Sequence, residues 1–278
     1  MGGRLEIAAN GGSAYFSAMK IMTYNILEGG VGRIDPLAEV IRLSGADVVV
    51  VEEATDEGLF QKLADRVGMD RFLAQSPREK EGAVGVMSRL KIVEGVNHGA
   101  LDGRLTRSAV HVIVEVRSRE SGVRSLLPIV GVHLHARETI EDEAVRMTEL
   151  PGVFGIGELF RGRAHVICGD FNSYHPQQVV EMGKLREKTR KRIEGQGGVV
   201  PRDVVRAVLE RGYVDAHALH HPPAEFGTSF TTAHPGARVD YVFVTADLSG
   251  RVKGCEVFKP EMARFASDHF PVVCELDV

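Results

Sequence analysis

The chain has 278 residues, a formal net charge of −4 and a hydrophobic fraction of 44%. This length is sufficient for one large domain or two small ones, each with its own buried core. The slightly acidic charge balance excludes tight nucleic-acid binding through net charge alone and leaves room only for a local basic patch.

The cysteines and the apolar runs bear on where the protein works. Cys168, Cys255 and Cys274 have no paired spacing, and Cys168 and Cys274 lie in apolar runs. Buried free thiols are typical of a reducing environment, so the sequence predicts a cytoplasmic protein. No transmembrane segment is predicted, because the longest apolar run, over 126–134, is short and contains His133.

The first eighteen residues differ in composition from the rest of the chain. They are rich in Gly, Ala, Ser and Asn, and they lack the basic start and apolar core of a signal peptide. We expect residues 1–18 to be an N-terminal extension or an added leader, and residues 19–278 to form a single domain.

The first half of the chain alternates strand and helix patterns. After a strand over 20–27, Asp35 can cap a helix, Pro36 suits its first turn, and Gly45 ends it. Four valines over 48–51 predict a strand that is buried on both faces. The remaining predicted elements are a helix over 56–67, strands over 83–88, 108–117 and 126–135, and a helix over 138–160 that Pro151-Gly152 interrupts.

The second half has a similar design. Its predicted elements are a strand from 166, a helix over 177–193, a glycine-rich break at 195–198, a helix over 202–211, and strands over 213–215, 229–231, 239–245, 255–258 and 270–276. Strands and helices alternate without a repeat or a linker. This pattern predicts two sheets packed face to face with helices outside them.

The stretch Val166-Ile167-Cys168-Gly169-Asp170-Phe171-Asn172-Ser173 combines a buried strand with polar groups at its end. Alternate side chains of a strand share a face, so Asp170 and Asn172 are expected to point the same way at its carboxyl end. A carboxylate and a carboxamide held side by side can orient a water molecule and a phosphate oxygen together. The alternative is a buried strand that simply ends in an Asp/Asn turn.

Other predicted strands also end in polar residues. The set is Thr23-Tyr24-Asn25, Val51-Glu52-Glu53, His133-Leu134-His135, Gly169-Asp170-Phe171-Asn172, Arg238-Val239-Asp240-Tyr241 and Ser267-Asp268-His269-Phe270-Pro271. Over 20–278 this set resembles the endonuclease/exonuclease/phosphatase superfamily. The resemblance implies an α/β (α+β) fold, a four-layered α/β/β/α sandwich of two mixed, mainly antiparallel sheets flanked by helices, with the site at one edge of the sheets.

The resemblance also implies a metal site for Mg²⁺ or Mn²⁺. Glu53 and Asp268 match acidic metal positions of the superfamily, and Asn25 would support the metal or its bound water. Glu52 keeps the choice of carboxylate open, because it adjoins Glu53 and the superfamily usually has Gln there. Without the resemblance, Glu53 reads as a solvated strand end and Asn25 as a turn-forming residue after a strand.

Five further residues match catalytic positions. By resemblance, Asp170 would orient the attacking water, Asn172 the phosphate, and His133 would contact phosphate or the leaving oxygen. His269 would pair with Asp240 and act either as a general base or as a charged phosphate clamp. The other strand-end histidine and the loop histidines, His135, His217, His220, His221 and His234, have no such match, and zinc is not favoured because no further ligand cluster lies nearby.

Taken together, the sequence predicts a divalent-metal-dependent hydrolase of phosphate esters, a phosphodiesterase or nuclease. The alternatives are a phosphomonoesterase or phospholipid-headgroup hydrolase of the same fold, and a catalytically silent scaffold. The substrate is expected to be a phosphate ester, with nucleic acid among the candidates, and the sequence does not specify the oligomeric state. Six Lys or Arg against two Glu over 184–194 indicate either a solvated helix face or a lining for a polyanionic substrate.

Overall fold

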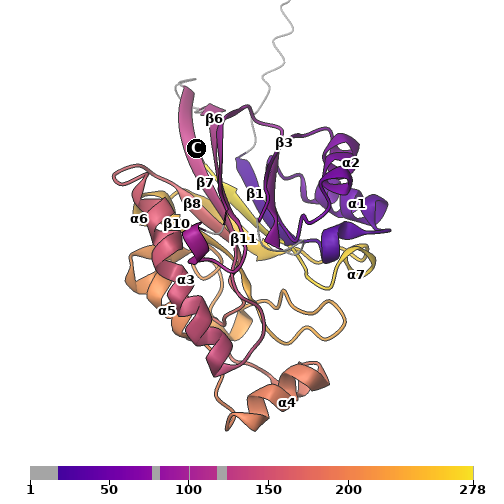
Figure 1. Ribbon diagram of the computed structural model, residues 1–278, viewed down its shortest axis with the longest axis vertical. Coiled ribbons are helices and arrows are strands. Elements are labelled where there is room, and N and C mark those ends of the chain that lie inside the picture. The colour runs from indigo at the N-terminus through magenta and orange to yellow at the C-terminus, as the bar shows by residue number, and fades with distance from the viewer. Residues whose placement is uncertain (1–17, 77–81, 100, 118–123, 278) are drawn as a thin grey trace, which may run out of the picture.

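The computed structural model describes residues 18–76, 82–99, 101–117 and 124–277 (Figure 1). The predicted extension therefore lies outside the described residues, apart from Ala18. One six-stranded sheet has the order β11 (Val252–Val257), β12 (Val272–Leu276), β1 (Met19–Asn25), β2 (Val48–Glu52), β4 (Val84–Ser88), β3 (Asp70–Ala74). The second has the order β5 (Ile92–Gly99), β6 (Ala109–Arg117), β7 (Arg124–His133), β8 (Val166–Asp170), β10 (Asp240–Thr245), β9 (Tyr213–Asp215).

Both sheets are mixed, because β1 pairs with β2 and β7 pairs with β8 in parallel, whereas the other pairs are antiparallel. Side chains from the facing surfaces of the two sheets form a common core. A second core lies between the first sheet and the helices α1 (Ile34–Ser44), α2 (Glu57–Val67) and α7 (Ala263–Ala266), and a third between the second sheet and α3 (Ile140–Glu158) and α5 (Asp203–Glu210). The predicted four-layered α/β/β/α sandwich is confirmed, as Figure 1 shows.

The valine run of β2 shows how the sequence produces these layers. Val48 and Val50 belong to the core between the sheets, whereas Val49 and Val51 belong to the core beneath α1 and α2. This is the period of two that a strand imposes on a run that is apolar on both faces. By the same period, Glu52 points toward the space between the sheets.

Two predicted elements were wrong and one was reduced to a bridge. The helix α3 is not interrupted at Pro151, and the helix predicted over 177–193 is confined to α4 (Glu187–Gly195), preceded by a short turn at Met182–Lys184. The strand predicted over 229–231 amounts to an isolated bridge of Phe230 with Ala237 and His269. The edge strands β3 and β5 were not predicted.

The three cysteines are buried and free, as the sequence predicts. Cys168, Cys255 and Cys274 are free and buried in the core between the sheets. None of the helices formed by the described residues is long and apolar enough to cross a lipid bilayer.

Candidate active site at the edge of the two sheets

Three polar residues lie side by side where neighbouring strands of the second sheet reach the same edge. His133, Asp170 and Asp240 are register partners across β7, β8 and β10. In these strands, residues of the same alternation, such as Cys168 and Val242, face the core between the sheets. The row of three therefore points into the space at the end of that core.

The first sheet contributes a matching group to the same place. Asn25 and Glu52 are register partners at the ends of β1 and β2. The Nδ2 atom of Asn25 donates to Oδ2 of Asp170 at 3.3 Å and to Oε1 of Glu53 at 3.1 Å. Hydrogen bonds between side chains thus join the two sheets at this edge.

His269 completes the cluster from the loop before β12. Its Nδ1 lies 3.0 Å from Oδ2 of Asp240, and its Nε2 lies 3.8 Å from Oδ2 of Asp170. Burial lowers the pKa of His269, but the charge and hydrogen bond of Asp240, together with the charges of Asp170 and Asp268, outweigh burial and hold that pKa well above its ordinary value. The geometry therefore favours an imidazolium whose orientation is fixed by Asp240.

Asp170 is the buried carboxylate at the centre of the group. Burial, and then the charge of Asp240, raise the pKa of Asp170 above its ordinary value, while the His269 charge opposes them. The Nε2 atom of His133 lies 3.5 Å from Oδ2 of Asp170. A carboxylate with a raised pKa beside two imidazoles is suited to accept a proton near neutral pH.

Asn172 does not reach the site through the strand alternation that the sequence predicts. The strand β8 ends at Asp170, and Asn172 lies beyond it with a left-handed φ of 51°. Its backbone N–H donates to Oδ1 of Asp170 at 2.9 Å, and its Nδ2 donates to the carbonyl of Leu134 at 3.2 Å. Gly169 is required just before this turn, because its φ is 148° and a Cβ there would lie 1.9 Å from the carbonyl oxygen of Val132.

Glu52 and Glu53 have opposite environments. Glu52 is fully buried and accepts a hydrogen bond from Oγ1 of Thr23 at 2.6 Å. Burial, together with the charge of Asp240, raises the pKa of Glu52 well above its ordinary value. Glu53 lies past the strand with a φ of 60°, and its Oε2 accepts from the backbone N–H of Glu28 at 2.7 Å. Of these two glutamates, therefore, only Glu53 presents its carboxylate at the rim of the site.

Asp268 offers a further oxygen to the same edge. The Ser267 hydroxyl beside it donates to the carbonyl of Asn25 at 2.7 Å, which ties this loop to the end of β1. Oδ1 of Asp268 is buried and has no hydrogen-bond partner among the residues that the structure describes. A buried carboxylate oxygen without a donor is costly unless a cation lies beside it, and hard divalent cations prefer such oxygens. The unpartnered oxygen of Asp268 therefore fits Mg²⁺ or Mn²⁺ as a ligand, and the carboxylate of Glu53 is a second oxygen donor at this edge.

The amide of Asn25 has a different place in that arrangement. Its Oδ1 accepts from the backbone N–H of Leu27 at 3.0 Å, while its Nδ2 is directed at the carboxylates of Glu53 and Asp170. Asn25 thus orients the acidic groups. Among the described residues, a tight group of possible ligand atoms is formed by Asp170, Asp240 and His269, whose atoms lie within 4.8 Å of one another.

Arg107 is a basic residue of the site that the sequence patterns did not reveal. Its Nη1 donates to the carbonyl of Leu134 at 2.7 Å, one residue beyond His133. Burial, followed by the charges of Arg107 and His269, lowers the pKa of His133 well below its ordinary value, so this imidazole is neutral. No motif marks Arg107, because it precedes β6 and reaches the site only through the pairing of β6 with β7.

The neighbouring His135 is not part of the cluster. Its Nε2 lies 3.0 Å from Oδ1 of Asp142 in the first turn of α3, and its backbone N–H donates to Glu149. Its side chain is engaged with a helix rather than with His133.

A comparison with known protein families matches the same elements. The model of the Endonuclease/Exonuclease/phosphatase family aligns with residues 22–269. The chain belongs to this family. The match runs from β1 to the histidine of the candidate site, so the strand-end residues of both sheets lie inside it. A comparison with curated protein sequences finds no match.

Solved structures of the family share the fold at low sequence identity. An AP endonuclease from Archaeoglobus fulgidus has a TM-score of 0.66 and 19% identity, over 94% of this chain and 100% of that chain. The 3′ phosphatase NExo from Neisseria, bound to a product DNA hairpin, has a TM-score of 0.64 and 21% identity, over 94% and 100% of the two chains. The catalytic domain of Xenopus laevis APE2 has values of 0.65 and 16%, over 93% and 92%.

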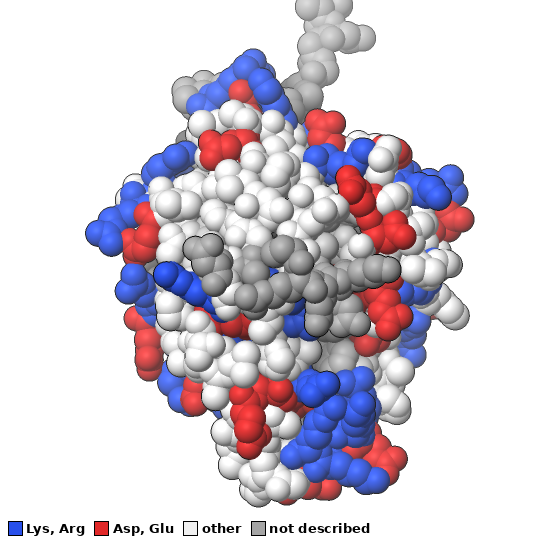
Figure 2. All heavy atoms as spheres, in the orientation of Figure 1, with Lys and Arg blue, Asp and Glu red and all other residues white. Residues whose placement is uncertain are grey.

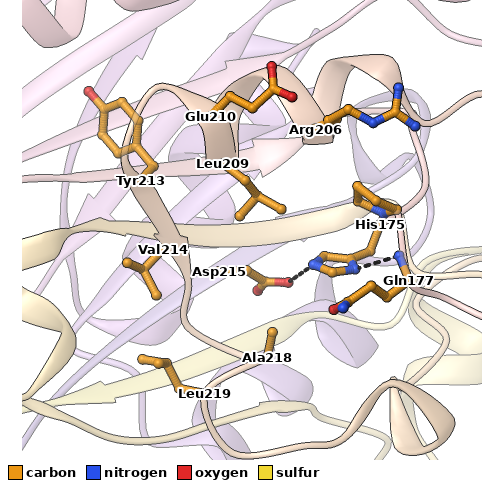
Figure 3. Close-up of a pocket in the computed structure, with 11 residues that line it drawn as sticks. His175, Gln177, Arg206, Leu209, Glu210, Tyr213, Val214, Asp215, Ala218 and Leu219 are labelled. Atoms are coloured by element: carbon orange, nitrogen blue, oxygen red, sulfur yellow. Dashed lines mark hydrogen bonds and ion pairs between the residues drawn. The ribbon is translucent and has the colours of Figure 1, made fainter.

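A cavity of about 490 Å³ lies apart from the strand-end cluster, beside β9 and α5 (Figure 3). The His175 side chain lies between Asp215, at 3.9 Å from Nε2, and the backbone N–H of Gln177, which donates to Nδ1 at 3.1 Å.

Asp215 also forms a buried two-point ion pair with Arg238. Since Arg238 lies two residues before Asp240, this ion pair anchors the start of β10 next to the site. His217, one of the loop histidines without a match in the superfamily, is buried as well.

Proposed function

We propose that the protein is a divalent-metal-dependent phosphodiesterase or nuclease that works by in-line attack of water on phosphorus. The observation that carries this proposal is the buried group of Asp170, Asp240 and His269, with ligand atoms within 4.8 Å of one another, in a member of a phosphoesterase family. Such a group, beside the unpartnered carboxylate oxygen of Asp268, suits a reaction in which a proton leaves water while charge grows on phosphate.

Asp170 and Asn172 would act on the attacking side. Asp170 would take the proton of the water, which its raised pKa allows, and the backbone N–H of Asn172 would hold its other oxygen in place. Asn25 fixes the same carboxylate from the first sheet. The Asn172 side chain would orient the phosphate once it leaves its contact with Leu134.

The imidazoles and Arg107 would bind the phosphate. An imidazolium at His269, held by Asp240, would stabilise charge on a non-bridging oxygen. His133 is neutral and would contact the leaving oxygen, with Arg107 adding positive charge beside it. A bound Mg²⁺ or Mn²⁺ would supply Lewis-acid polarisation of the phosphoryl group, and Glu53 and Asp268 would hold it.

A nucleic-acid phosphodiester is the substrate class that we favour. The family contains solved structures described as an AP endonuclease and as a 3′ phosphatase bound to a DNA hairpin. A special role at abasic sites is a poor fit. Abasic-site endonucleases of the superfamily carry a tyrosine and asparagine motif before the Gly-Asp-Phe-Asn signature, whereas this chain has His133-Leu134-His135 there and no Trp. We further propose that residues 19–278 act as one catalytic domain and that the protein works in the cytoplasm, where its three thiols stay reduced.

The experiment is a substrate panel assayed with Mg²⁺, Mn²⁺ or EDTA. DNA, RNA, a phospholipid headgroup substrate, a phosphomonoester and a small chromogenic diester are incubated with the wild type, with Asp170→Asn and with the charge-matched control Asp203→Asn. Asp203 is exposed on α5 and pairs with Arg206. We expect metal-dependent cleavage of a diester that only Asp170→Asn abolishes. A protein that binds partners but turns over none of these substrates is the silent scaffold, and faster monoester cleavage indicates a phosphatase.

A further inference from the structure

The helix α4 carries a local basic surface. In Figure 1 it projects at the lower end of the molecule, and Figure 2 shows Lys and Arg side chains gathered there. The segment 184–192 contains six Lys or Arg and one Glu: Lys184, Arg186, Lys188, Arg190, Lys191 and Arg192, with Glu187. In a chain with a net charge of −4, this surface concentrates basic side chains in one place, and five of the six also pair with a glutamate at 2.6 to 3.6 Å.

The basic residues lie on two different flanks of the helix. Thr189 and Ile193 are buried and mark the side that packs on the protein. Arg186 and Arg190 are four residues apart and share one flank, whereas Lys188 lies on the other. Any ligand that follows one flank therefore meets the two arginines without meeting Lys188.

Arg186 lies one aromatic ring away from the candidate site. Its guanidinium carbon is 4.8 Å from the centre of the Phe230 ring. The Phe230 ring is in turn 4.6 Å from the ring of His269. Through these two contacts of the Phe230 ring, the arginine flank of α4 adjoins the cluster in which the phosphate would be cleaved.

The Arg186 side chain is held in place but keeps its charge available. Its Nε donates to Oγ1 of Thr189 at 3.0 Å, and its Nη2 lies 3.5 Å from Oε1 of Glu138. Glu138 is shared with Arg192, whose Nη1 lies 2.7 Å from its other oxygen. One carboxylate between two guanidinium groups leaves net positive charge. The Arg186 side chain is 37% exposed, so part of its donor fork faces solvent.

We propose that Arg186 binds a second phosphate of a nucleic-acid strand, next to the phosphate held at Asp170 and His269, and that Arg190 extends this contact by one helical turn. The inference rests on the proposed phosphodiesterase function. A nucleic-acid backbone presents evenly spaced anions along a strand, so one phosphate can occupy the catalytic cluster while its neighbours follow the arginine flank. A small phosphate ester has no second anion for Arg186.

Binding without turnover gives the first test. A fluorescent single-stranded oligonucleotide is titrated in EDTA against the wild type, Arg186→Ala and the control Lys188→Ala. We expect Arg186→Ala to weaken binding about 10-fold or more, as the loss of a charge-assisted contact predicts, and to lower the salt slope by about 0.7. Lys188→Ala should change affinity less than about 2-fold, since one exposed lysine off the path contributes little. Arg186→Lys should recover part of the loss, because it restores the charge but not the fork.

Substrate length gives the second test, in the presence of Mg²⁺. A dinucleotide with a single phosphodiester is compared with a hexanucleotide, and the loss caused by Arg186→Ala should be at least about 10-fold larger for the hexanucleotide. Equal losses at both lengths, or equal binding by the Arg186 and Lys188 variants, overturn the proposal. Weaker binding to anionic phospholipid vesicles but not to the oligonucleotide overturns it in favour of a lipid surface. If the wild type cleaves no diester, the proposed function fails, while the binding titration still decides the role of Arg186.

Discussion

The two adjacent glutamates at the end of β2 differ in what their side chains touch. Glu53→Gln removes a carboxylate from the proposed metal site, so we expect the Mg²⁺ concentration for half-maximal activity to rise about 10-fold or more. Glu52→Gln replaces a buried neutral acid by a neutral amide of similar shape, so we expect little change in activity or stability. A metal titration of both variants measures this. An equal or larger effect at Glu52 would identify it as the ligand instead.

His269 and Asp240 are joined by a hydrogen bond of 3.0 Å and should act as one unit. We expect His269→Ala and Asp240→Asn each to lower kcat by roughly 100-fold or more, as the loss of a general acid-base or charge-stabilising group does. The double variant should be little worse than His269→Ala alone. The kcat values of the four proteins form the cycle, and fully multiplicative losses would show that the two residues work independently.

The positions of single site residues could be predicted from the sequence where these residues lie at the ends of strands. Asp170, Asp240 and His133 end or begin strands, and the period of two brings them to one edge. Asn172 was misplaced because the strand stops at Asp170. Arg107 was missed because only the pairing of distant strands brings it to the site, a relation that spacing along the chain does not encode.

His175 lies beside the ion pair of Asp215 and Arg238 that anchors the start of β10, and its protonation should make the stability of this region depend on pH. Burial lowers the pKa of His175 to about 4, below the value of about 6.5 for an unfolded histidine. Between these values the unfolded state binds more protons, so stability falls as the pH is lowered from about 6.5 toward 4. We expect the loss of unfolding free energy from pH 7 to pH 5 to be about 1 kcal/mol smaller in His175→Asn.

Urea titrations at the two pH values measure this change. The variant His234→Asn, at an exposed position, is the control and should keep the wild-type dependence. An identical pH dependence in His175→Asn would place the responsible proton on another group. One further buried histidine, His217, has a pKa lowered to about 3 by burial and should account for part of the remaining slope.

The two wrong helix predictions have specific causes. Pro151 lies on the exposed face of α3, where water can bond the backbone carbonyl that a proline cannot serve, so the helix continues. Over 177–186 a helix is replaced by an arginine contact. The Arg202 guanidinium donates to the carbonyls of His175, Pro176 and Gln178, and these contacts hold the start of the segment in a non-helical conformation.

The edge strands β3 and β5 were missed for the opposite reason. Both have several exposed or half-buried residues, so their apolar pattern is weak. The central strands are buried on both faces, and their valine-rich runs carry a strong signal. The strong pattern of the central strands therefore allowed the packed sheets to be predicted. The edge strands could not be predicted, because they depend on pairing with neighbouring strands and not on their own apolar pattern.

Metal binding should be visible in the stability of the whole molecule. A cation that binds only the folded state at 100 times its dissociation constant stabilises it by about 2.7 kcal/mol. We expect Mg²⁺ or Mn²⁺ to raise the thermal midpoint of the wild type relative to EDTA, and Asp268→Asn to remove most of the shift. Circular dichroism melting curves measure it. A shift of the same size in Asp268→Asn would mean that the stabilising cation binds elsewhere.

The position of β12 has a consequence for how the protein comes into existence. β12 lies between β11 and β1, and its register joins Met19 to Leu276. On the ribosome, β1 emerges long before this neighbour, which follows about 250 residues later along the chain, and contacts of such long sequence separation slow folding. Asp268 and His269 emerge immediately before β12. The proposed catalytic group therefore stays incomplete until residues 268–276 have been made, and the activity proposed for it would appear in the same step that adds β12 to the sheet.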